Sequence, residues 1–402
     1  MAKKIHKMLR TFRLAFILWI AFFVVGCDSS LAEQKTDGGL SDGGTNCEAE
    51  DHRRLPLDCT SAADCDDSDP CTTEICQDSI CHFTANDISL RENWIQTKGS
   101  ALSVVLRENR IYVAEEVDGG VDGGSGVEIF NITKLKTPKS IGFAETKGIA
   151  LAVDVLPNGK GFAVAEGEMG IETFDSTNFK RQKQVQSGKG PLKAVDDVRS
   201  ILLGKKYAVA SSFDKGAAIL AGGTANITGA GHEKLPGRAL NAAIYNNDIA
   251  FVACSLGGAV SLNLQKEEKK PKMAGRILTE GRVLDVAVSQ DTALMAEYGV
   301  GFSIVDYFDA QKPQRLYKMP SDFPTVAVSL LGPQTGVTAT KTGTISVFSL
   351  IDPCLPKIMD TWEATGEPLD LNTWKDRIAV ALGSQGVVIL ETGCTPENDS
   401  SK

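Results

Sequence analysis

Any chemistry in this chain would rest on carboxylates and cysteines, because its 402 residues include only four histidines. Acidic residues recur at two matching positions of a sequence repeat of 41 to 51 residues. Carboxylates grouped in this way could bind a hard cation such as Ca²⁺ or attract a basic partner. The alternative is that each acid is a turn residue, solvated or hydrogen-bonded to backbone amides. The first position holds Asp154, Asp285 and Asp370, and the second holds Glu115, Glu166 and Glu297.

Nucleophilic catalysis by serine or cysteine needs a histidine base. Outside the first 26 residues, the chain has only His52, His82 and His232. The first two fall among clustered cysteines, and we expect His232 in an exposed glycine-rich loop. The sequence contains no G-x-S-x-G, G-x-x-x-x-G-K-[ST] or H-E-x-x-H motif. The residue types therefore favour binding over catalysis.

Six cysteines are clustered near the N-terminus, and an even number at this density in an exported chain predicts a disulfide framework. They are Cys47, Cys59, Cys65, Cys71, Cys76 and Cys81. Several pairings are open, and the sequence does not choose among them. The segment from Cys65 to Cys81 resembles the short Cys/Asp-rich repeats of secreted and surface proteins of bacteria and slime moulds.

Three further cysteines lie in the C-terminal part of the chain. Cys254 ends the apolar run IAFVAC and is expected to be a buried free thiol. Cys354 and Cys394 occupy matching places in the last two repeats, so a disulfide between them is a candidate clamp. Equivalent points on neighbouring repeats also have to come within ~5.5 Å for such a bond.

The N-terminus reads as an export signal. Five basic residues precede an uncharged apolar run from Leu14 to Val25, which is too short to span a membrane. The segment Val24-Val25-Gly26-Cys27 resembles the lipobox of bacterial lipoproteins. The resemblance implies that Cys27 carries acyl chains such as palmitate and anchors the chain to the bacterial cell envelope, at the periplasmic side or the cell surface. An ordinary secretory signal is the alternative.

Charge is divided unevenly along the chain. Its net charge is −9, and removal of the five basic residues of the signal leaves −14. Residues 27–86 contain 14 acidic and three basic residues, and residues 28–46 are polar and glycine-rich, as in a flexible tether. This acidity argues against nucleic acid as a partner.

A repeat of 41 to 51 residues fills the rest of the chain, marked by an apolar residue followed by a small one. A glycine and a second alternating strand follow most copies, and further apolar runs complete each unit. Four short strands per unit predict an all-β propeller with seven blades. The copies are Val113-Ala114, Val164-Ala165, Val209-Ala210, Val252-Ala253, Met295-Ala296, Ala339-Thr340 and Val380-Ala381.

The ring also has a predicted closure. Trp94-IQTKG resembles Phe143-AETKG at the end of the first unit, whereas the last unit stops near Gly393, after its third strand. We therefore expect an N-terminal strand to complete the seventh blade.

The units resemble LVIVD repeats, a bacterial β-propeller family, most clearly at Ile111-YVA-Glu115 and Gly301-FSIVD. The third and sixth units match less well, which leaves six blades as an alternative.

The sequence thus predicts four parts. They are a lipoprotein signal peptide (1–26), a flexible acidic tether (27–46), a small disulfide-rich module (47–86) and an LVIVD-like β-propeller (87–402). The expected function is that of a membrane-anchored exported lipoprotein whose propeller is a non-enzymatic platform for a protein or other surface ligand. The alternative is a Ca²⁺-dependent propeller hydrolase, such as a lactonase or esterase, that uses the six acids.

Overall fold

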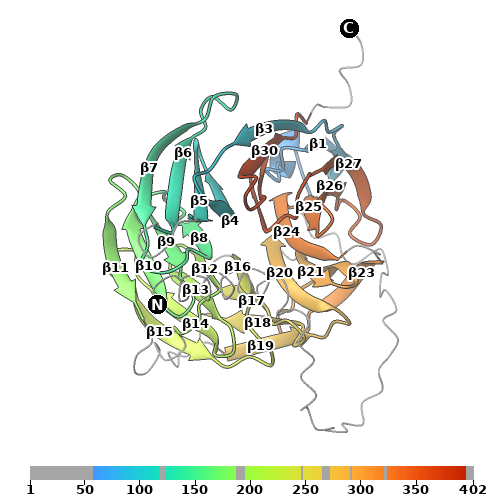
Figure 1. Cartoon of the computed structure of the whole chain (residues 1–402). Helices are drawn as coiled ribbons and strands as arrows, with labels where there is room; N and C mark the ends of the chain where they lie inside the picture. The colour runs from blue at the N-terminus through green and yellow to red at the C-terminus, as the bar shows by residue number, and fades with distance from the viewer. Residues whose placement is uncertain are drawn as a thin grey trace, which may run out of the picture. The chain divides into compact units, whose positions relative to one another are not determined.

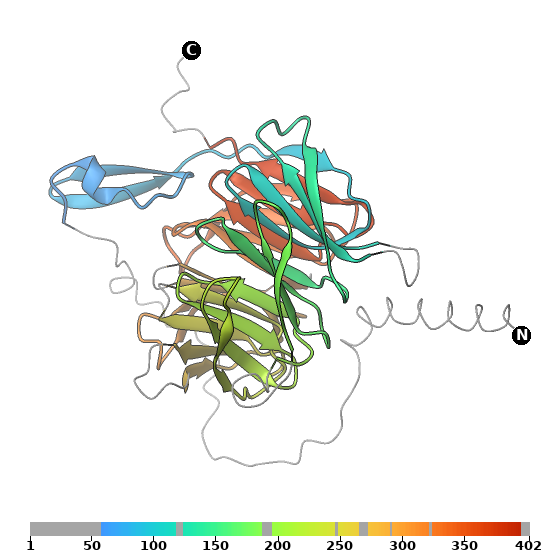
Figure 2. The same cartoon turned by 90° about the vertical axis from the view of Figure 1, so that its left-hand side faces the viewer.

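A computed structural model describes residues 58–117, 124–186, 195–245, 248–264, 272–289, 292–320 and 324–394. The predicted signal, the tether, Cys27 and Cys47 lie outside these residues. No helix in the described residues is long and apolar enough to cross a membrane. The described chain is almost entirely β, with strands arranged as a ring of blades (Figure 1) that Figure 2 shows from the side.

Seven four-stranded antiparallel sheets form the blades, and the first strand of each sheet is the innermost. Blade 1 comprises β4 (Ser100–Arg107), β5 (Arg110–Glu116), β6 (Gly126–Asn131) and β7 (Lys139–Glu145). Blade 2 comprises β8 (Ala152–Val155), β9 (Gly161–Ala165), β10 (Ile171–Asp175) and β11 (Arg181–Val185). Blade 3 comprises β12 (Ser200–Leu203), β13 (Tyr207–Ser212), β14 (Gly216–Ala221) and β15 (Thr228–Glu233).

The remaining blades follow the same order. Blade 4 comprises β16 (Asn241–Tyr245), β17 (Ile249–Ala253), β18 (Ala259–Asn263) and β19 (Lys272–Ile277). Blade 5 comprises β20 (Arg282–Ser289), β21 (Thr292–Tyr298), β22 (Gly301–Asp306) and β23 (Gln314–Pro320). Blade 6 comprises β24 (Thr325–Gly332), β25 (Thr335–Thr340), β26 (Thr344–Ser349) and β27 (Lys357–Glu363). Blade 7 comprises β28 (Asp370–Trp374), β29 (Arg377–Ala381), β30 (Val387–Glu391) and β3 (Arg91–Ile95).

Blade 7 closes the ring with a strand from the N-terminal side. Strand β3 pairs antiparallel with β30, so that Trp94 lies opposite Val388. This is the closure expected from the Trp94 segment. Seven blades are present, and the six-blade alternative is wrong because the poorly matching third and sixth units each form a complete sheet.

The hydrophobic core is divided among the seven junctions between neighbouring blades. One buried cluster joins blades 1 and 2 through Tyr112 and Phe162, whose ring centroids lie 5.3 Å apart. Another joins blade 7 to blade 1 through Ile389 and Val104. The apolar and small residues of the second strands supply much of this packing, and all five residues of β9 are buried. Each blade is therefore stabilised by both neighbours.

Two faces of the ring can be defined from the turns. The hairpin face carries the turns between the first and second strands, and the turn face carries those between the second and third strands. On the turn face, backbone bridges join the turn of one blade to the next blade: Gly167 to Val198, Phe213 to Ala239, Ser255 to Val283 and Gly383 to Ala101. The turn residue has positive φ at each of these junctions, including +33° at Phe213. Such backbone strain at a bulky residue costs ~1–3 kcal/mol.

The cysteine-rich module contains η1 (Ala62–Cys65), β1 (Thr72–Gln77) and β2 (Ile80–Ala85). Disulfides Cys59–Cys76 and Cys65–Cys81 staple it, and Cys71 is bonded to Cys394 after the last strand of the chain. The predicted Cys354–Cys394 pair is therefore wrong, since Cys71 takes Cys394. Cys354 is itself disulfide-bonded.

Asp69 anchors the module on the hairpin face of blade 6. Its buried carboxylate accepts hydrogen bonds from Gln334 N (3.0 Å) and from the Thr335 hydroxyl (3.0 Å). A Cβ on Gly332 would lie within 2.6 Å of the Asp69 Cα, so only glycine permits this approach. The module and the propeller belong to one compact unit.

Candidate functional site

The six predicted acids lie on, or directly after, the two innermost strands of their blades. Asp154, Asp285 and Asp370 lie on inner strands, and the three glutamates lie at or just after the ends of second strands. Five of the six are buried, and Asp370 is partly buried. Asp285 and Asp370 lie opposite the corresponding alanines Ala296 and Ala381 of their second strands, whereas Asp154 lies opposite Ala163, two residue pairs nearer the hairpin.

Each of the three aspartates joins its blade to the next. The Asp154 Oδ2 accepts a hydrogen bond from Leu203 N at 2.6 Å, between blades 2 and 3. The Asp285 Oδ2 accepts one from Val328 N at 2.8 Å, between blades 5 and 6. Their second oxygens accept the N–H of the following residue of their own strand.

Asp370 makes the same kind of contact at the closure of the ring. Its Oδ2 accepts a hydrogen bond from Val104 N at 2.9 Å, which links blade 7 to blade 1. Asn372, two residues later, accepts one from Leu106 N at 2.9 Å. These contacts agree with the alternative interpretation of the acids, in which they bind backbone amides.

Burial governs the charge of these aspartates. The pKa of Asp154 is raised to about 6 and that of Asp285 to about 7, mainly by loss of hydration and in smaller part by the negative charge of Asp370. The pKa of Asp370 is also raised by burial. The backbone N–H groups oppose this effect because they stabilise the charged form.

The glutamates of blades 1 and 2 hold a recurring Thr-Lys-Gly loop. The Glu115 Oε2 accepts a hydrogen bond from Gly99 N at 3.0 Å, and the Glu166 Oε2 accepts one from Gly148 N at 3.0 Å. In each loop the threonine hydroxyl donates to the carbonyl of the glycine. These loops belong to the two similar segments, Trp94-IQTKG and Phe143-AETKG, that predicted the ring closure. Both segments therefore also contact predicted acids.

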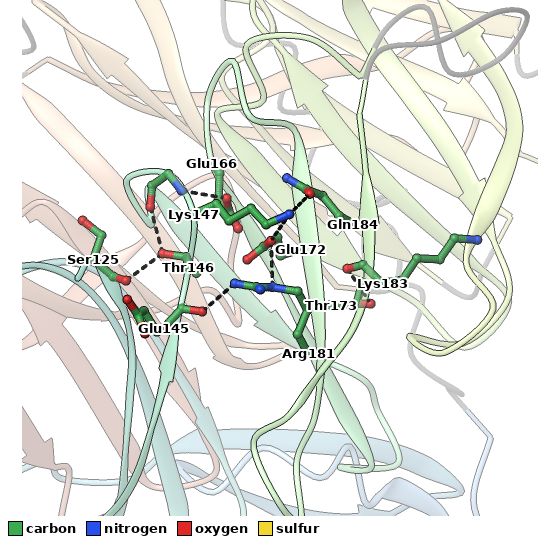
Figure 3. A network of polar contacts seen from close by, with 11 residues as sticks. Ser125, Glu145, Thr146, Lys147, Glu166, Glu172, Thr173, Arg181, Lys183 and Gln184 are labelled. Carbon is green, nitrogen blue, oxygen red and sulfur yellow. Dashed lines mark hydrogen bonds and ion pairs between the residues drawn. The ribbon is translucent and has the colours of Figure 1, made fainter. Parts of the chain in front are cut away.

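A second glutamate, which was not among the predicted acids, lies beside the first in both blades. In blade 2, Glu172 is fully buried and its Oε1 lies 2.8 Å from Arg181 Nε and 4.0 Å from Lys147 Nζ (Figure 3). Lys147 also donates to Gln184. The pKa of Glu166 is raised to about 8, mainly by burial and next by the negative charge of the adjacent Glu172. The repeated Gly-x-Glu at the start of the third strand could have shown this pair.

Blade 1 repeats the arrangement, and blade 5 varies it. Glu128 lies 3.0 Å from Lys98 Nζ and accepts a hydrogen bond from the Ser140 hydroxyl. Burial raises the pKa of the neighbouring Glu115. In blade 5, Glu297 instead lies 3.2 Å from Arg315 Nη2 and accepts a hydrogen bond from Ser303.

This arrangement does not fit a Ca²⁺ site. Calcium takes six to eight oxygen ligands, whereas the aspartates and Glu166 accept backbone N–H groups. Glu172 and Glu297 are paired with arginines. Among the described residues, the one group of metal-ligating side chains close enough to share an ion is Cys59, Cys65 and Cys81. Those three sulfurs are in disulfides and are not thiolate ligands.

The other candidate residues lie apart from the acids. His232 lies in the outer strand β15, and not in a loop as predicted, and it is exposed, as is His82. His52 lies outside the described residues. Cys254 is a buried free thiol, as predicted, and burial raises its pKa to about 12.

A patch on the turn face was not predicted, and we call it the turn patch. Leu256 is 70% exposed and Leu278 is 64% exposed. A Cβ on Gly258 would lie 3.2 Å from the Leu278 Cα, so the two leucine loops are adjacent. The turn patch comprises Arg199, Phe213, Arg238, Leu256 and Leu278.

Phe213 forms the aromatic end of the turn patch. The guanidinium carbons of Arg199 and Arg238 each lie 4.7 Å from the centre of its ring. Arg199 pairs with Asp197 at 2.8 Å and Arg238 with Asp214 at 3.1 Å. Gly237 packs against Gly257, which links this end to the leucines.

Comparison with known proteins identifies the fold alone. No protein-family model and no curated protein matches the chain. Among solved structures 1743 chains match, so the architecture is common and does not point to one function. One is the crystal structure of the computationally designed protein Ika8, 9% identical, with a TM-score of 0.54 over 75% of this chain and 98% of that one. The LVIVD likeness therefore stays a resemblance.

Proposed function

We propose that this protein is an exported, lipid-anchored binding protein whose propeller presents the turn patch to a protein ligand. The observation that carries the proposal is the exposure of Leu256 and Leu278 on loops that backbone bridges hold in place. Exposed apolar groups beside arginines and an aromatic ring are typical of the centres of protein interfaces. Rigid loops also lose little entropy on binding.

Export and anchoring rest on sequence features together with the disulfides. Three disulfides among the described residues fit an oxidising compartment. Cys27 of the lipobox-like segment is the proposed lipid attachment site. Replacement of Cys27 by serine is expected to abolish labelling of the protein by a fatty-acid probe, and persistent labelling would contradict the anchor.

The competing proposal, a Ca²⁺-dependent hydrolase, has weaker support because the six acids bind backbone amides and basic side chains. Calorimetry with Ca²⁺ tests it on the mature chain and on a variant with Asp154, Asp285 and Asp370 changed to Asn. We expect no saturable binding by either protein. Tight binding that the triple substitution removes, with turnover of an ester or lactone, would favour the hydrolase.

Site-specific photocrosslinking in intact cells tests the turn patch. A photoreactive residue at position 256 or 278 is expected to give the same discrete adduct. The control position is Ile141, which is 40% exposed on the outer strand of blade 1 and lies outside the patch. Loss of the adduct in an Arg238→Glu variant would tie it to the patch. The proposal fails if the patch positions give no adduct or if position 141 gives the same one.

A further inference from the structure

The hairpin face of blades 7, 1, 2 and 3 carries a concentration of positive charge that no function above uses. We call it the basic crescent, and it includes the inner-hairpin residues of these four consecutive blades. Glu108 and Asp376 are the acidic residues of the same hairpins. The basic residues are Arg107, Arg110, Lys160, Lys205, Lys206, Lys375 and Arg377.

Arg107 and Arg110 of the crescent are held in place without neutralisation. Arg107 lies over the Trp374 ring, 4.5 Å from its centre, and donates to Val155 O at 3.3 Å. Arg110 donates to Ser176 O at 2.7 Å. Within the described part of the chain, no carboxylate lies within 4.0 Å of Arg107, Arg110, Lys160 or Lys375. Backbone carbonyls orient the guanidinium groups and leave their charge available.

The cysteine-rich module supplies the opposite charge on the same face. Residues 58–86 contain seven acidic residues and no lysine or arginine. Asp58, Asp64, Asp66 and Asp78 are exposed. Asp69 and the Cys71–Cys394 bond fix the module on blade 6. Among the described residues, no ion pair joins the module to the crescent of its own chain.

Other acids of the hairpin face lie on the same side as the module. Asp248, Asp306, Asp309 and Asp352 follow the strands of blades 4, 5 and 6 at this face. Three of them cap their own loops by accepting backbone N–H groups. The face is thus divided into a basic part and an acidic part.

A face divided in this way is complementary to a second copy of itself. Consider a two-fold axis that lies in the plane of the face and passes near the junction of blades 6 and 7. In a seven-bladed ring, this axis places blade 6 of one copy opposite the junction of blades 7 and 1 of the second copy, where Arg107 and Trp374 lie. It also brings blades 4 and 5 opposite blades 1 to 3. Two-fold contacts of this kind use the same patch on both subunits.

We propose that the hairpin face is a self-association surface, on which the acidic module of one copy binds the basic crescent of a second copy, twice about a two-fold axis. Because the attraction is between exposed charges, it weakens as salt screens them. The turn patch stays free on the opposite face of both copies.

Sedimentation of the mature chain carrying Cys27→Ser tests the proposal. We expect a dimer at low ionic strength that dissociates in 0.5 M salt, where the screening length is only a few ångströms, roughly 3–5 Å. A crescent variant carries Lys160→Glu and Lys375→Glu, and a module variant carries Asp58→Lys and Asp78→Lys. Each alone is expected to weaken the dimer at least about tenfold, because every reversed charge acts at both symmetric contacts.

Mixing the two variants gives the sharpest result. The crescent variant and the module variant are each repelled by themselves but attracted by each other, so they are expected to form a heterodimer. A matched control on the turn face, Lys215→Glu with Lys234→Glu, is expected to dimerise like the parent. A monomeric parent at low salt would overturn the proposal, as would a dimer that neither salt nor the paired variants affect. Because this readout does not involve the turn patch, it is independent of the crosslinking result.

Discussion

Cys71 is disulfide-bonded to Cys394, which lies 323 residues later in the chain. The two cysteines flank the closing strand β3 and its partner β30 in sequence. The seam at which the ends of the propeller meet is therefore joined by a covalent bond as well as by strand pairing. The same bond fixes the cysteine-rich module to the ring.

Removing this bond is expected to destabilise the whole propeller. Changing Cys71 and Cys394 to serine leaves only strand pairing at the seam. A bond that closes so long a loop also restricts the unfolded chain strongly. We expect the free energy of unfolding to fall by about 2–4 kcal/mol. Denaturant unfolding measured by tryptophan fluorescence checks this, because Trp94 and Trp374 lie in blade 7.

The control is a variant with Cys59 and Cys76 changed to serine. That bond lies within the module, so the unfolding midpoint of the propeller should stay near that of the parent. Equal losses in both variants would contradict a special role for the Cys71–Cys394 bond.

Asp285 is expected to make stability depend on pH. Burial raises its pKa from 3.8 to about 7, so the folded protein binds this proton more tightly than the unfolded chain. The contribution of Asp285 to stability is therefore greatest below pH 4 and declines as pH rises to about 7. The decline is on the order of 2–4 kcal/mol.

An Asp285→Asn variant should remove most of that decline, because its amide oxygen can still accept from Val328 N and carries no charge. Unfolding free energies between pH 4 and pH 8 measure the difference. Asp285→Ala is the contrasting change, since it leaves a buried N–H without an acceptor and should cost about 1–3 kcal/mol. Parallel pH profiles for the parent and the Asn variant would refute the assignment.

Glu166 should make stability depend on pH over a higher range than Asp285 does. Its pKa is raised from 4.5 to about 8 by burial and by Glu172, so its contribution to stability is lost as pH rises from about 4.5 through 8. Arg181 and Lys147 offset part of the repulsion. Glu166→Gln should match the parent below about pH 4.5 and exceed its melting temperature by an increasing margin as pH rises toward 8. A variant less stable than the parent at pH 9 would rule this out.

Phe213 should separate stability from binding. Its positive φ lies at a bridge position that blades 2 and 7 fill with Gly167 and Gly383. Phe213→Gly relieves the strain but loses contacts with two arginines, and these effects nearly cancel, to within about 1 kcal/mol. The same variant should lose the adduct formed from position 256. Strong destabilisation, or an unchanged adduct, would contradict a binding role for this ring.

The periodic features of the sequence predicted most of the fold. Apolar and small residues recur at a spacing that only four short strands per unit satisfy, and this predicted the seven blades. The likeness of the Trp94 and Phe143 segments predicted the closing strand. Both signals are local, because strand alternation and turn residues act between neighbours in the chain.

Partners across blade junctions were decided by the tertiary structure alone. Nothing near Cys394 in sequence indicates Cys71, and nothing near Asp285 indicates the amide of Val328. The aspartates that suggested a cation site instead bind the next blade, and their burial raises their pKa values. Such contacts depend on how the blades pack around the ring, whereas the sequence records directly only the pattern within each blade.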